Sequence, residues 1–300
     1  MKKILITGGS GLLAVNWALY LREKFKITLL LHSRKIVMDE VNCFFEDLSS
    51  YHNCVKVLEK YEPDYVINTA AITSIEVCEK NENLAYEINV DLAINLAKAC
   101  NNLSIKLIHI STDHLFSGIK KVYKEIDKAE PLNIYALTKQ IAEQGVLDSS
   151  DTAIVIRTNF YGWGPSYRLS FSDYIIEALK KDKIIHLFKD VFFTPVYVDC
   201  LFDFVDELIF RDFKGIYNIS SNEVISKYDF GILISKEFGF NPDLIIPISI
   251  DEKTNLIKRP KNMSLDNEKI SIKTGKVMPK IDLQLNQLAE SKNKLLLEKL

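Results

Sequence analysis

The stretch Lys3-Ile4-Leu5-Ile6-Thr7-Gly8-Gly9-Ser10-Gly11-Leu12 joins a short apolar run to a glycine turn and leads into the apolar-periodic segment Leu12 to Phe25. Such a run, turn and periodic segment predict a strand, a tight connection and a helix. The N-terminus of that helix offers backbone N–H groups and a positive dipole end, so Gly8, Ser10, Gly11 and Leu12 are predicted to bind a pyrophosphate. A tight strand-to-helix turn without a ligand is the competing interpretation.

The segments that follow keep alternating between apolar runs and helical patterns. Strands are predicted at Lys26 to Leu31, Asn42 to Glu46, Asp64 to Ala70 and Lys106 to Ile110, and a helix from about Leu84 to Cys100. Near-continuous apolar strands separated by helices predict an α/β fold with a doubly wound parallel sheet covered on both faces. Ligands of such sheets bind at the carboxyl ends of the strands.

Residues at these strand ends predict a dinucleotide site. The second strand ends in His32-Ser33-Arg34, with no acid to bind a ribose 2′-hydroxyl about 20 residues after the glycines. Ser33 and Arg34 could instead bind a 2′-phosphate, so NADP(H) is predicted, with NAD(H) left open. The other residues predicted to contact the cofactor are Asp47 and Leu48 at the adenine, and Ala70, Ala71 and Thr73 beside the flat part of the ligand.

Tyr135 and Lys139 are four positions apart in Tyr135-Ala136-Leu137-Thr138-Lys139. On a helix this spacing places the two side chains on one face, one turn apart. A tyrosine hydroxyl with a pKa of about 10 is a weak acid or base catalyst at neutral pH, and a neighbouring ammonium is expected to lower that pKa. The pair therefore predicts a proton-transfer site, although a half-buried tyrosine beside a solvated lysine has the same spacing.

Composition limits the class of protein. The 300 residues are 47% hydrophobic and carry a net charge of -2, which with no basic patch argues against a nucleic-acid partner. The five cysteines are Cys43, Cys54, Cys78, Cys100 and Cys200. They form no CxxC pair, so we expect reduced thiols in a cytoplasmic protein. The histidines lack metal-ligand spacing, so no catalytic metal is predicted. No apolar run approaches a membrane span, and the run ending at Thr7 is too short for a signal peptide.

Several further segments form a characteristic pattern through their order and spacing along the chain. They are Ile6 to Gly11, Pro63 to Ala71, Ile110 to Gly118, Pro131 to Lys139, Ile156 to Gly162, Phe193 to Val196, and Arg259-Pro260 followed by Leu265-Asp266 and Lys269. With these segments the chain resembles, over almost its whole length, the extended short-chain dehydrogenase/reductase family. More narrowly, it resembles the dTDP-4-dehydrorhamnose reductase-like branch, which reduces nucleotide-linked 4-keto-6-deoxy sugars. Each segment is weak alone, whereas their order and spacing are specific.

The resemblance implies roles for the predicted residues. Tyr135 would give a proton to the carbonyl oxygen, Lys139 would bind the nicotinamide ribose and lower the tyrosine pKa, and Thr112 would hydrogen-bond the substrate oxygen. Carbonyl reduction requires these groups, because the developing alkoxide must be hydrogen-bonded and then protonated. The residues implied to face the sugar nucleotide are Asp113, His114, Asn159, Trp163, Thr194 and Arg259.

The chain departs from related dehydratases at Thr112-Asp113-His114, where those enzymes typically carry Thr-Asp-Glu. Without the glutamate, dehydration loses its base, which favours reduction. His114 is also a variation within the reductases, and either a substrate contact or a packed, satisfied imidazole fits it. Equally, Trp163 could pack the hinge between the two parts of the chain, and Arg259 could hold the loop before Pro260.

From about Phe160 onward the alternation of strands and helices changes. A helix is predicted at Ser170 to Lys180, extended pieces at Lys183 to Val191, strand and helix at Thr194 to Phe210, and a strand at Gly215 to Ser220. We therefore predict a Rossmann domain of residues 1–159 and about 191–220, and a smaller α/β C-terminal substrate lobe of residues 160–190 and 221–300. A nucleotide-sugar epimerase and a non-catalytic NADP-binding regulatory subunit are the alternative functions, and a homodimer is left open.

Overall fold

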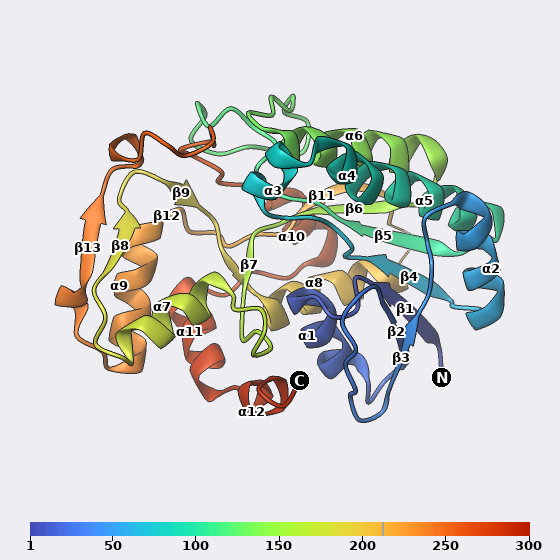
Figure 1. The fold of residues 1–300 in the computed structure, drawn as a ribbon, viewed down its shortest axis with the longest axis horizontal. Coiled ribbons are helices and arrows are strands. Elements are labelled where there is room, and N and C mark those ends of the chain that lie inside the picture. Colours follow the sequence, from blue (N-terminus) through green and yellow to red (C-terminus); the bar gives the residue numbers. More distant parts are fainter. Residues whose placement is uncertain (212) are drawn as a thin grey trace.

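The computed structural model describes residues 1–211 and 213–300 and is organised around one seven-stranded sheet (Figure 1). In spatial order its strands are β11 (Gly215–Asn218), β6 (Ile154–Arg157), β5 (Lys106–Ile110), β4 (Tyr65–Asn68), β1 (Lys3–Thr7), β2 (Lys26–Leu31) and β3 (Val41–Phe45). Every neighbouring pair is parallel. The chain winds outward from β1 in one direction and from β4 in the other, so the doubly wound parallel sheet is confirmed. Ligands of such sheets bind at this reversal point.

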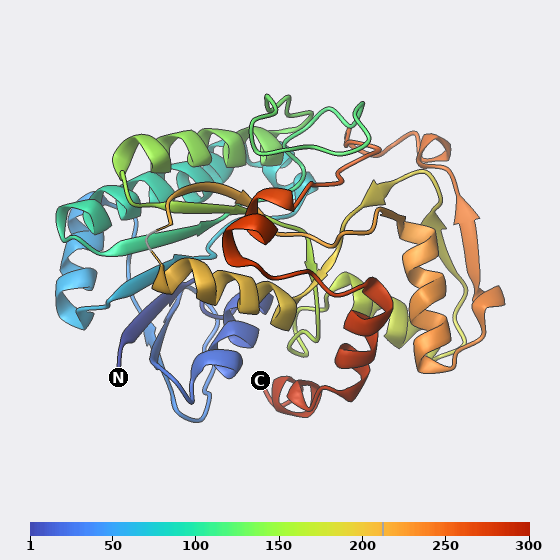
Figure 2. The ribbon, with the colours of Figure 1, turned by 180° about the vertical axis from the view of Figure 1, so that it is seen from behind.

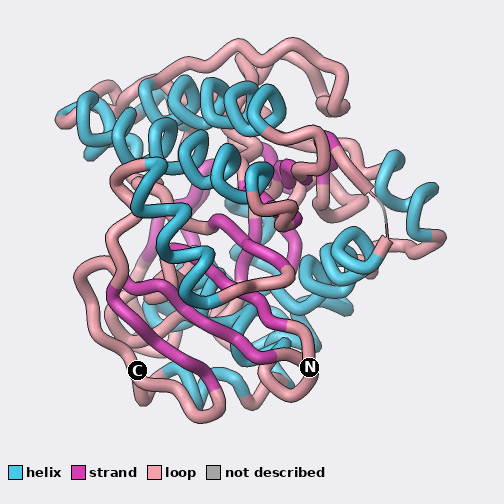
Figure 3. The backbone as a smooth tube through the Cα atoms, turned by 90° about the vertical axis from the view of Figure 1, so that its right-hand side faces the viewer, coloured by secondary structure: helices cyan, strands magenta, loops and turns pink. Residues whose placement is uncertain are grey.

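Helices cover both faces of the sheet (Figure 1, Figure 2). One face carries α2 (Tyr51–Tyr61), α5 (Leu92–Asn102) and α6 (Ile134–Ser149), and the other carries α1 (Leu12–Leu21) and α8 (Val198–Phe210). Along β1, Ile4 and Ile6 pack with α1 and α8, whereas Leu5 packs with α2 and α5. This follows from the two-residue period of a strand, which sends successive side chains to opposite faces. Figure 3 shows the resulting layers from the side.

The edge strand β3 differs from the expectation of near-continuous buried strands. Phe44 and Phe45 are 42% and 50% exposed, because an edge strand has one neighbour and less cover. The helix predicted to reach Phe25 ends at Leu21. The helix predicted at Leu84 to Cys100 is interrupted, and its parts are α4 (Glu82–Tyr86), the π-helical turn η1 (Glu87–Asp91) and α5.

The second part of the chain builds a smaller lobe at the far end of the sheet (Figure 1). Its elements are β7 (Phe160–Tyr161), α7 (Phe171–Leu179), β8 (Ile185–Phe188), β9 (Phe192–Phe193), β10 (Val196–Tyr197), β12 (Ile225–Ser226), α9 (Lys227–Phe238), η2 (Pro242–Leu244), β13 (Ile245–Ile248), η3 (Ile250–Glu252) and α11 (Ile281–Glu290). One buried apolar cluster runs from α1 and α8 into α7, α9 and α11. The lobe therefore shares a core with the sheet.

Three short helices complete the structure, namely α3 (Ile75–Lys80), α10 (Glu268–Thr274) and α12 (Asn293–Leu297). Helix α10 contacts β11 and α8, and α12 contacts α1, so the C-terminal residues touch the sheet layer as well as the lobe. The predicted division of the chain into two domains stays a prediction.

Candidate active site

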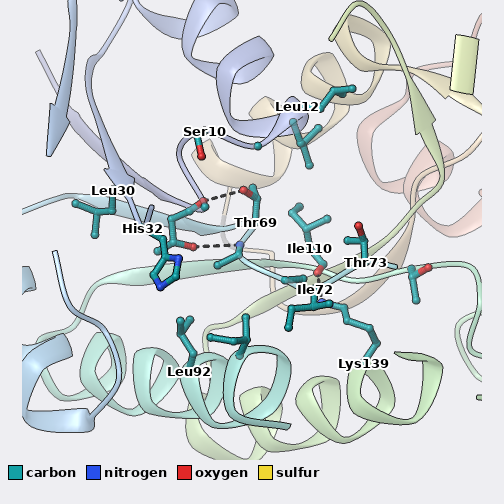
Figure 4. A pocket seen from close by; sticks show the side chains of 18 of the residues that line it. Ser10, Leu12, Leu30, His32, Thr69, Ile72, Thr73, Leu92, Ile110 and Lys139 are labelled. Atoms are coloured by element: carbon teal, nitrogen blue, oxygen red, sulfur yellow. Dashed lines mark hydrogen bonds between the residues drawn. The ribbon is translucent and has the colours of Figure 1, made fainter. Parts of the chain in front are cut away.

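A cavity of about 1050 Å³ opens where the strands end (Figure 4). In the close-up, Ser10 and Leu12 lie on one side of it, and Leu92 and Lys139 on the other. Most of the predicted site residues line its wall. They are Gly8, Ser10, Gly11, Leu12, Ser33, Asp47, Leu48, Ala70, Ala71, Thr73, Thr112, Asp113, His114, Tyr135, Lys139 and Asn159. The carboxyl ends of parallel strands meet at one edge, which is why residues so far apart in sequence gather here.

The glycine turn lies tightly against the end of β4. Gly8 has a φ of +64°, and a Cβ added to it would lie 2.9 Å from the Ala70 nitrogen and Cα. The Thr69 hydroxyl donates to the Thr7 carbonyl at 2.7 Å, which ties β4 to β1. No side chain caps α1 at Gly11, so the first N–H groups of the helix remain available to an anion. The turn therefore fits a pyrophosphate.

The end of β2 contributes Ser33 to the cavity wall, whereas Arg34 is exposed and lies beside it. The Arg34 guanidinium is 4.1 Å from the centre of the Tyr167 ring. The Tyr167 hydroxyl in turn donates to the Ser10 carbonyl at 2.9 Å. Through Tyr167, Arg34 is thus held next to the glycine turn. A cation at this position fits the predicted 2′-phosphate.

Helix α6 presents Tyr135 to the cavity from its first turn. The helix begins there because the Asn133 side chain accepts the Ala136 N–H at 2.9 Å and caps the N-terminus. Burial raises the pKa of Tyr135 to about 12, and a hydrogen bond with the Thr112 hydroxyl acts in the opposite direction. The predicted lowering of this pKa by Lys139 is therefore wrong: desolvation dominates, and the group that lowers it is Thr112.

Lys139 is buried and points toward β5. Its Nζ donates to the Ile110 carbonyl at 2.7 Å and lies 3.3 Å from Nε2 of His109. Burial lowers the pKa of Lys139 to about 8, with the nearby Glu143 carboxylate acting in the opposite direction. The lysine is therefore much easier to deprotonate than an ordinary lysine. Tyr135, one helical turn away, is not among the groups that shift its pKa.

Three of the predicted substrate residues form the wall beside Tyr135. Asn159 donates to Asp113 at 2.7 Å. The ring of His114 meets the Tyr135 ring edge-on at a centroid distance of 5.9 Å. Burial lowers the pKa of His114, and its Nδ1 atom is buried without a hydrogen-bond partner among the described residues. A packed imidazole with both nitrogens satisfied is thus not what the structure contains.

Other predicted substrate residues are not among the described residues that line the cavity. The Trp163 indole N–H donates to the Leu288 carbonyl at 2.9 Å inside the core. The Thr194 hydroxyl accepts the Leu265 N–H at 3.0 Å, and Arg259 pairs with Glu76 at 2.6 Å. In this structure these groups contact segments far away in sequence, and their predicted contacts with a sugar nucleotide stay a prediction.

Some side chains near the site are absent from the predicted set. Arg157 on β6 and Glu143 on α6 form a buried ion pair at 2.7 Å. Arg168 reaches across the cavity edge and donates to the Thr73 hydroxyl at 3.0 Å. An arginine inside the otherwise apolar strand Ile154–Arg157 is the only sequence signal for the first pair, and Arg168 lies in a loop that carries none.

In the part of the chain that the structure describes, residues 1–211 and 213–300, no three His, Cys, Asp or Glu side chains are grouped so as to hold a metal ion. Nor does that part contain a helix with the length and apolar character needed to cross a membrane.

Comparison with known proteins places this geometry in a family. The family model of the RmlD substrate binding domain matches residues 1–293. The chain is 28% identical over 283 residues to the dTDP-4-dehydrorhamnose reductase of Aggregatibacter actinomycetemcomitans, covering 90% of this chain and 92% of that one. It is 26% identical over 290 residues to methionine adenosyltransferase 2 subunit beta of Pongo abelii, covering 90% and 81%.

Solved structures agree with this assignment. The fold superimposes on the crystal structure of dTDP-4-dehydrorhamnose reductase (rfbD) from Bacillus anthracis in complex with NADP, with a TM-score of 0.82 and 26% identity. That match covers 96% of this chain and 99% of the other. The chain therefore belongs to the RmlD substrate binding domain family and has the fold of the extended short-chain dehydrogenases/reductases.

Proposed function

We propose that the protein is an NADPH-dependent reductase of a nucleotide-linked 4-keto-6-deoxy sugar. The observation that carries the proposal is that Thr112, Tyr135 and Lys139 line the same cavity as the glycine turn. Relatives named as reductases of such sugars, and a similar structure solved with NADP, support it. Fold alone would not, because one fold serves many reactions.

The cavity fits a reduced dinucleotide. Gly8 and Gly11 would hold the pyrophosphate against the N-terminus of α1, since a side chain at Gly8 would clash with Ala70. Ser33 and Arg34 would bind the 2′-phosphate, and NAD(H) remains the alternative. When bound there, the dinucleotide would supply the hydride.

The chain's own residues would manage the proton. With a pKa of about 12, the Tyr135 hydroxyl carries its proton at neutral pH and so holds the proton that a donor needs, although the raised pKa makes it a weaker acid than an ordinary tyrosine. It would donate its proton to the carbonyl oxygen of the sugar as the carbonyl carbon is reduced. The Thr112 hydroxyl would hydrogen-bond the same oxygen while negative charge develops on it. Lys139 would bind the ribose next to the nicotinamide.

The test is NADPH oxidation in the presence of dTDP-linked and UDP-linked 4-keto-6-deoxy sugars, with wild type and Tyr135→Phe. We expect kcat of the variant to fall by about a hundredfold or more, the usual scale for a lost proton donor, with NADPH affinity unchanged. Tyr174→Phe is the matched control, because Tyr174 is 48% exposed. Near-normal turnover of Tyr135→Phe would contradict the assigned donor.

A non-catalytic regulatory subunit is the second candidate. It is favoured by the similarity to methionine adenosyltransferase 2 subunit beta. NADPH binding without turnover of any keto-sugar, together with copurification of another enzyme, would support it. The same assay separates a nucleotide-sugar epimerase, which would interconvert sugars with no net NADPH consumption.

Location and assembly belong to the proposal as well. We infer a cytoplasmic protein, since Cys43, Cys54, Cys78, Cys100 and Cys200 are all free thiols. A homodimer is compatible with the chain and is tested by light scattering coupled to gel filtration. A mass corresponding to one chain would remove it.

A further inference from the structure

The loop of residues 162–170, between β7 and α7, joins two segments of the cavity wall. The Tyr167 hydroxyl donates to the Ser10 carbonyl in the glycine turn at 2.9 Å. The guanidinium of the next residue, Arg168, donates to the Thr73 hydroxyl after β4 at 3.0 Å. Ser10, Thr73 and Arg168 all line the cavity. The loop thus extends from the glycine turn to the segment after β4, and the proposed function gives Arg168 no role.

Hydrogen bonds within the loop fix the backbone of Arg168. Its N–H donates to the Pro165 carbonyl at 2.8 Å. The Asp173 carboxylate, near the start of α7, accepts the N–H groups of Gly164 and Ser170, each at 2.8 Å. A Cβ added to Gly164 would lie 2.2 Å from the Arg168 carbonyl oxygen, so a side chain at this position would clash with the turn. The turn therefore holds the arginine at the cavity, although its side chain is exposed.

The charge on Arg168 is not neutralised by a side chain in the described part of the protein. No described carboxylate pairs with its guanidinium, and its hydrogen-bond partner is the neutral Thr73 hydroxyl. By contrast, the guanidinium of Arg157 pairs with Glu143. A guanidinium has several N–H donors, of which the contact with Thr73 uses one. Arg168 therefore keeps its charge and further donors for an anion in the cavity.

The glycine turn supplies backbone donors to the same ligand class. No side chain caps α1 at Gly11, so the first N–H groups of the helix are available to an anion. Ser10 belongs to this turn and is bonded to Tyr167, the neighbour of Arg168. Helix N–H groups and a guanidinium are both groups that bind phosphates, and the guanidinium can contact two phosphate oxygens at once. Together they suit a pyrophosphate.

We propose that Arg168 binds the pyrophosphate of the dinucleotide together with the glycine turn, and that Thr73 holds the guanidinium beside this site in the apoprotein. The inference deepens the proposed function and rests on its cofactor site. An arginine in this role strengthens cofactor binding without taking part in the proton transfer, so its effect is measured as an affinity.

A nucleotide sugar also carries a diphosphate, but the neighbours of Arg168 favour the dinucleotide. Tyr167 contacts Ser10 in the glycine turn, and its ring lies under Arg34, the predicted partner of the 2′-phosphate. Thr73, which holds the guanidinium, is itself a predicted cofactor residue. NADPH and NADH share the pyrophosphate, so Arg168 should contribute equally to the binding of both, whereas Arg34 should serve only the 2′-phosphate.

The test is calorimetric titration of the apoprotein with NADPH, NADH, ADP-ribose and dTDP. ADP-ribose keeps the pyrophosphate and lacks the nicotinamide, and dTDP represents the diphosphate of a nucleotide sugar. We expect Arg168→Gln to weaken the binding of NADPH, NADH and ADP-ribose by the same factor, about tenfold or more, because each loses a charge-assisted contact. Arg168→Lys should recover part of this loss, since it keeps a point charge. The affinity for dTDP should not change.

Arg211→Gln is the matched control, because Arg211 is exposed and pairs with Glu207 on α8, and it should alter none of the affinities. Weaker binding of NADPH alone would assign Arg168 to the 2′-phosphate and overturn the proposal. Weaker binding of both dinucleotides with unchanged ADP-ribose would assign it to the nicotinamide end and overturn the proposal too. So would weaker binding of dTDP alone, or unchanged affinities throughout. Should one Arg168 variant fail to fold, the other decides by the same pattern.

None of these titrations needs turnover, so the two proposals can fail separately. A protein that shows the expected binding pattern but reduces no keto-sugar would contradict the proposed function and leave this inference intact. A protein that reduces a keto-sugar with NADPH, while its Arg168→Gln variant binds NADPH as tightly as wild type, would contradict this inference alone.

Discussion

Replacing Lys139 with methionine removes a buried cation from the candidate site while keeping an unbranched apolar stem. Burial lowers the lysine pKa from 10.5 to about 8. At about 1.4 kcal/mol per pH unit, this difference corresponds to about 3 kcal/mol. Because the folded pKa lies below the unfolded value, that free energy opposes folding fully below about pH 8. It is relieved as the pH rises toward the unfolded pKa.

The variant also loses the hydrogen bond to Ile110, which lowers its stability by an amount that does not depend on pH. Without Lys139, the Ile110 carbonyl loses its side-chain donor, and such a loss costs about 1–3 kcal/mol at any pH. At about pH 7 the variant should therefore equal wild type or exceed it by up to about 2 kcal/mol. The penalty of the charged lysine falls to about 1 kcal/mol at about pH 9.5. The stability of the variant relative to wild type should thus drop by about 2 kcal/mol between these pH values.

The assay is urea unfolding of wild type and Lys139→Met at both pH values, with NADPH oxidation measured in parallel. Reductase activity is expected to be lost while the fold is retained. Lys98→Met, at an exposed position on α5, is the matched control and should show no pH-dependent difference. A stability difference that is independent of pH, or one that grows in favour of the variant as pH rises, would refute the reasoning about the buried charge.

Three more predictions concern neighbouring residues. Arg34→Ala should weaken NADPH binding about tenfold or more and leave NADH binding unchanged, because only the 2′-phosphate loses its partner; equal weakening in titrations with both cofactors would contradict this. Glu143→Gln should destabilise the protein by about 3–5 kcal/mol in urea, since it leaves the buried Arg157 unpaired; a loss below about 1 kcal/mol would speak against a buried charge pair. Trp163→Phe should leave KM for the keto-sugar unchanged but lower the free energy of unfolding by about 1 kcal/mol, because the Leu288 carbonyl loses its hydrogen bond. A raised KM at unchanged stability would instead support a contact between Trp163 and the substrate.

Much of the architecture was predictable because it depends on local pattern and chain order. The apolar run Lys3–Thr7 and the glycine turn after it appear as predicted, and β2 and β5 have the predicted bounds. Parallel connections then force all strand ends to one edge. This is why residues as distant as Gly8, Ala70 and Tyr135 could be expected in one cavity.

Contacts between segments far apart in sequence were harder to predict. Trp163 and Thr194 lie in the family-like segments, but their partners, Leu288 and Leu265, are far along the chain, and no spacing rule links them. The exposure of Phe44 likewise depends on β3 being the last strand of the sheet, which apolar composition does not reveal.

By itself the sequence determined the alternation of strands and helices in the first part of the chain, the glycine turn, and the four-residue spacing of Tyr135 and Lys139, because each of these is a property of neighbouring residues. Only the tertiary structure decided the charge state around that pair. Burial raises the tyrosine pKa and lowers the lysine pKa, and His109 reaches Lys139 from β5. Desolvation and hydrogen bonding depend on what surrounds a side chain in space, and that appears only once the strands are packed together.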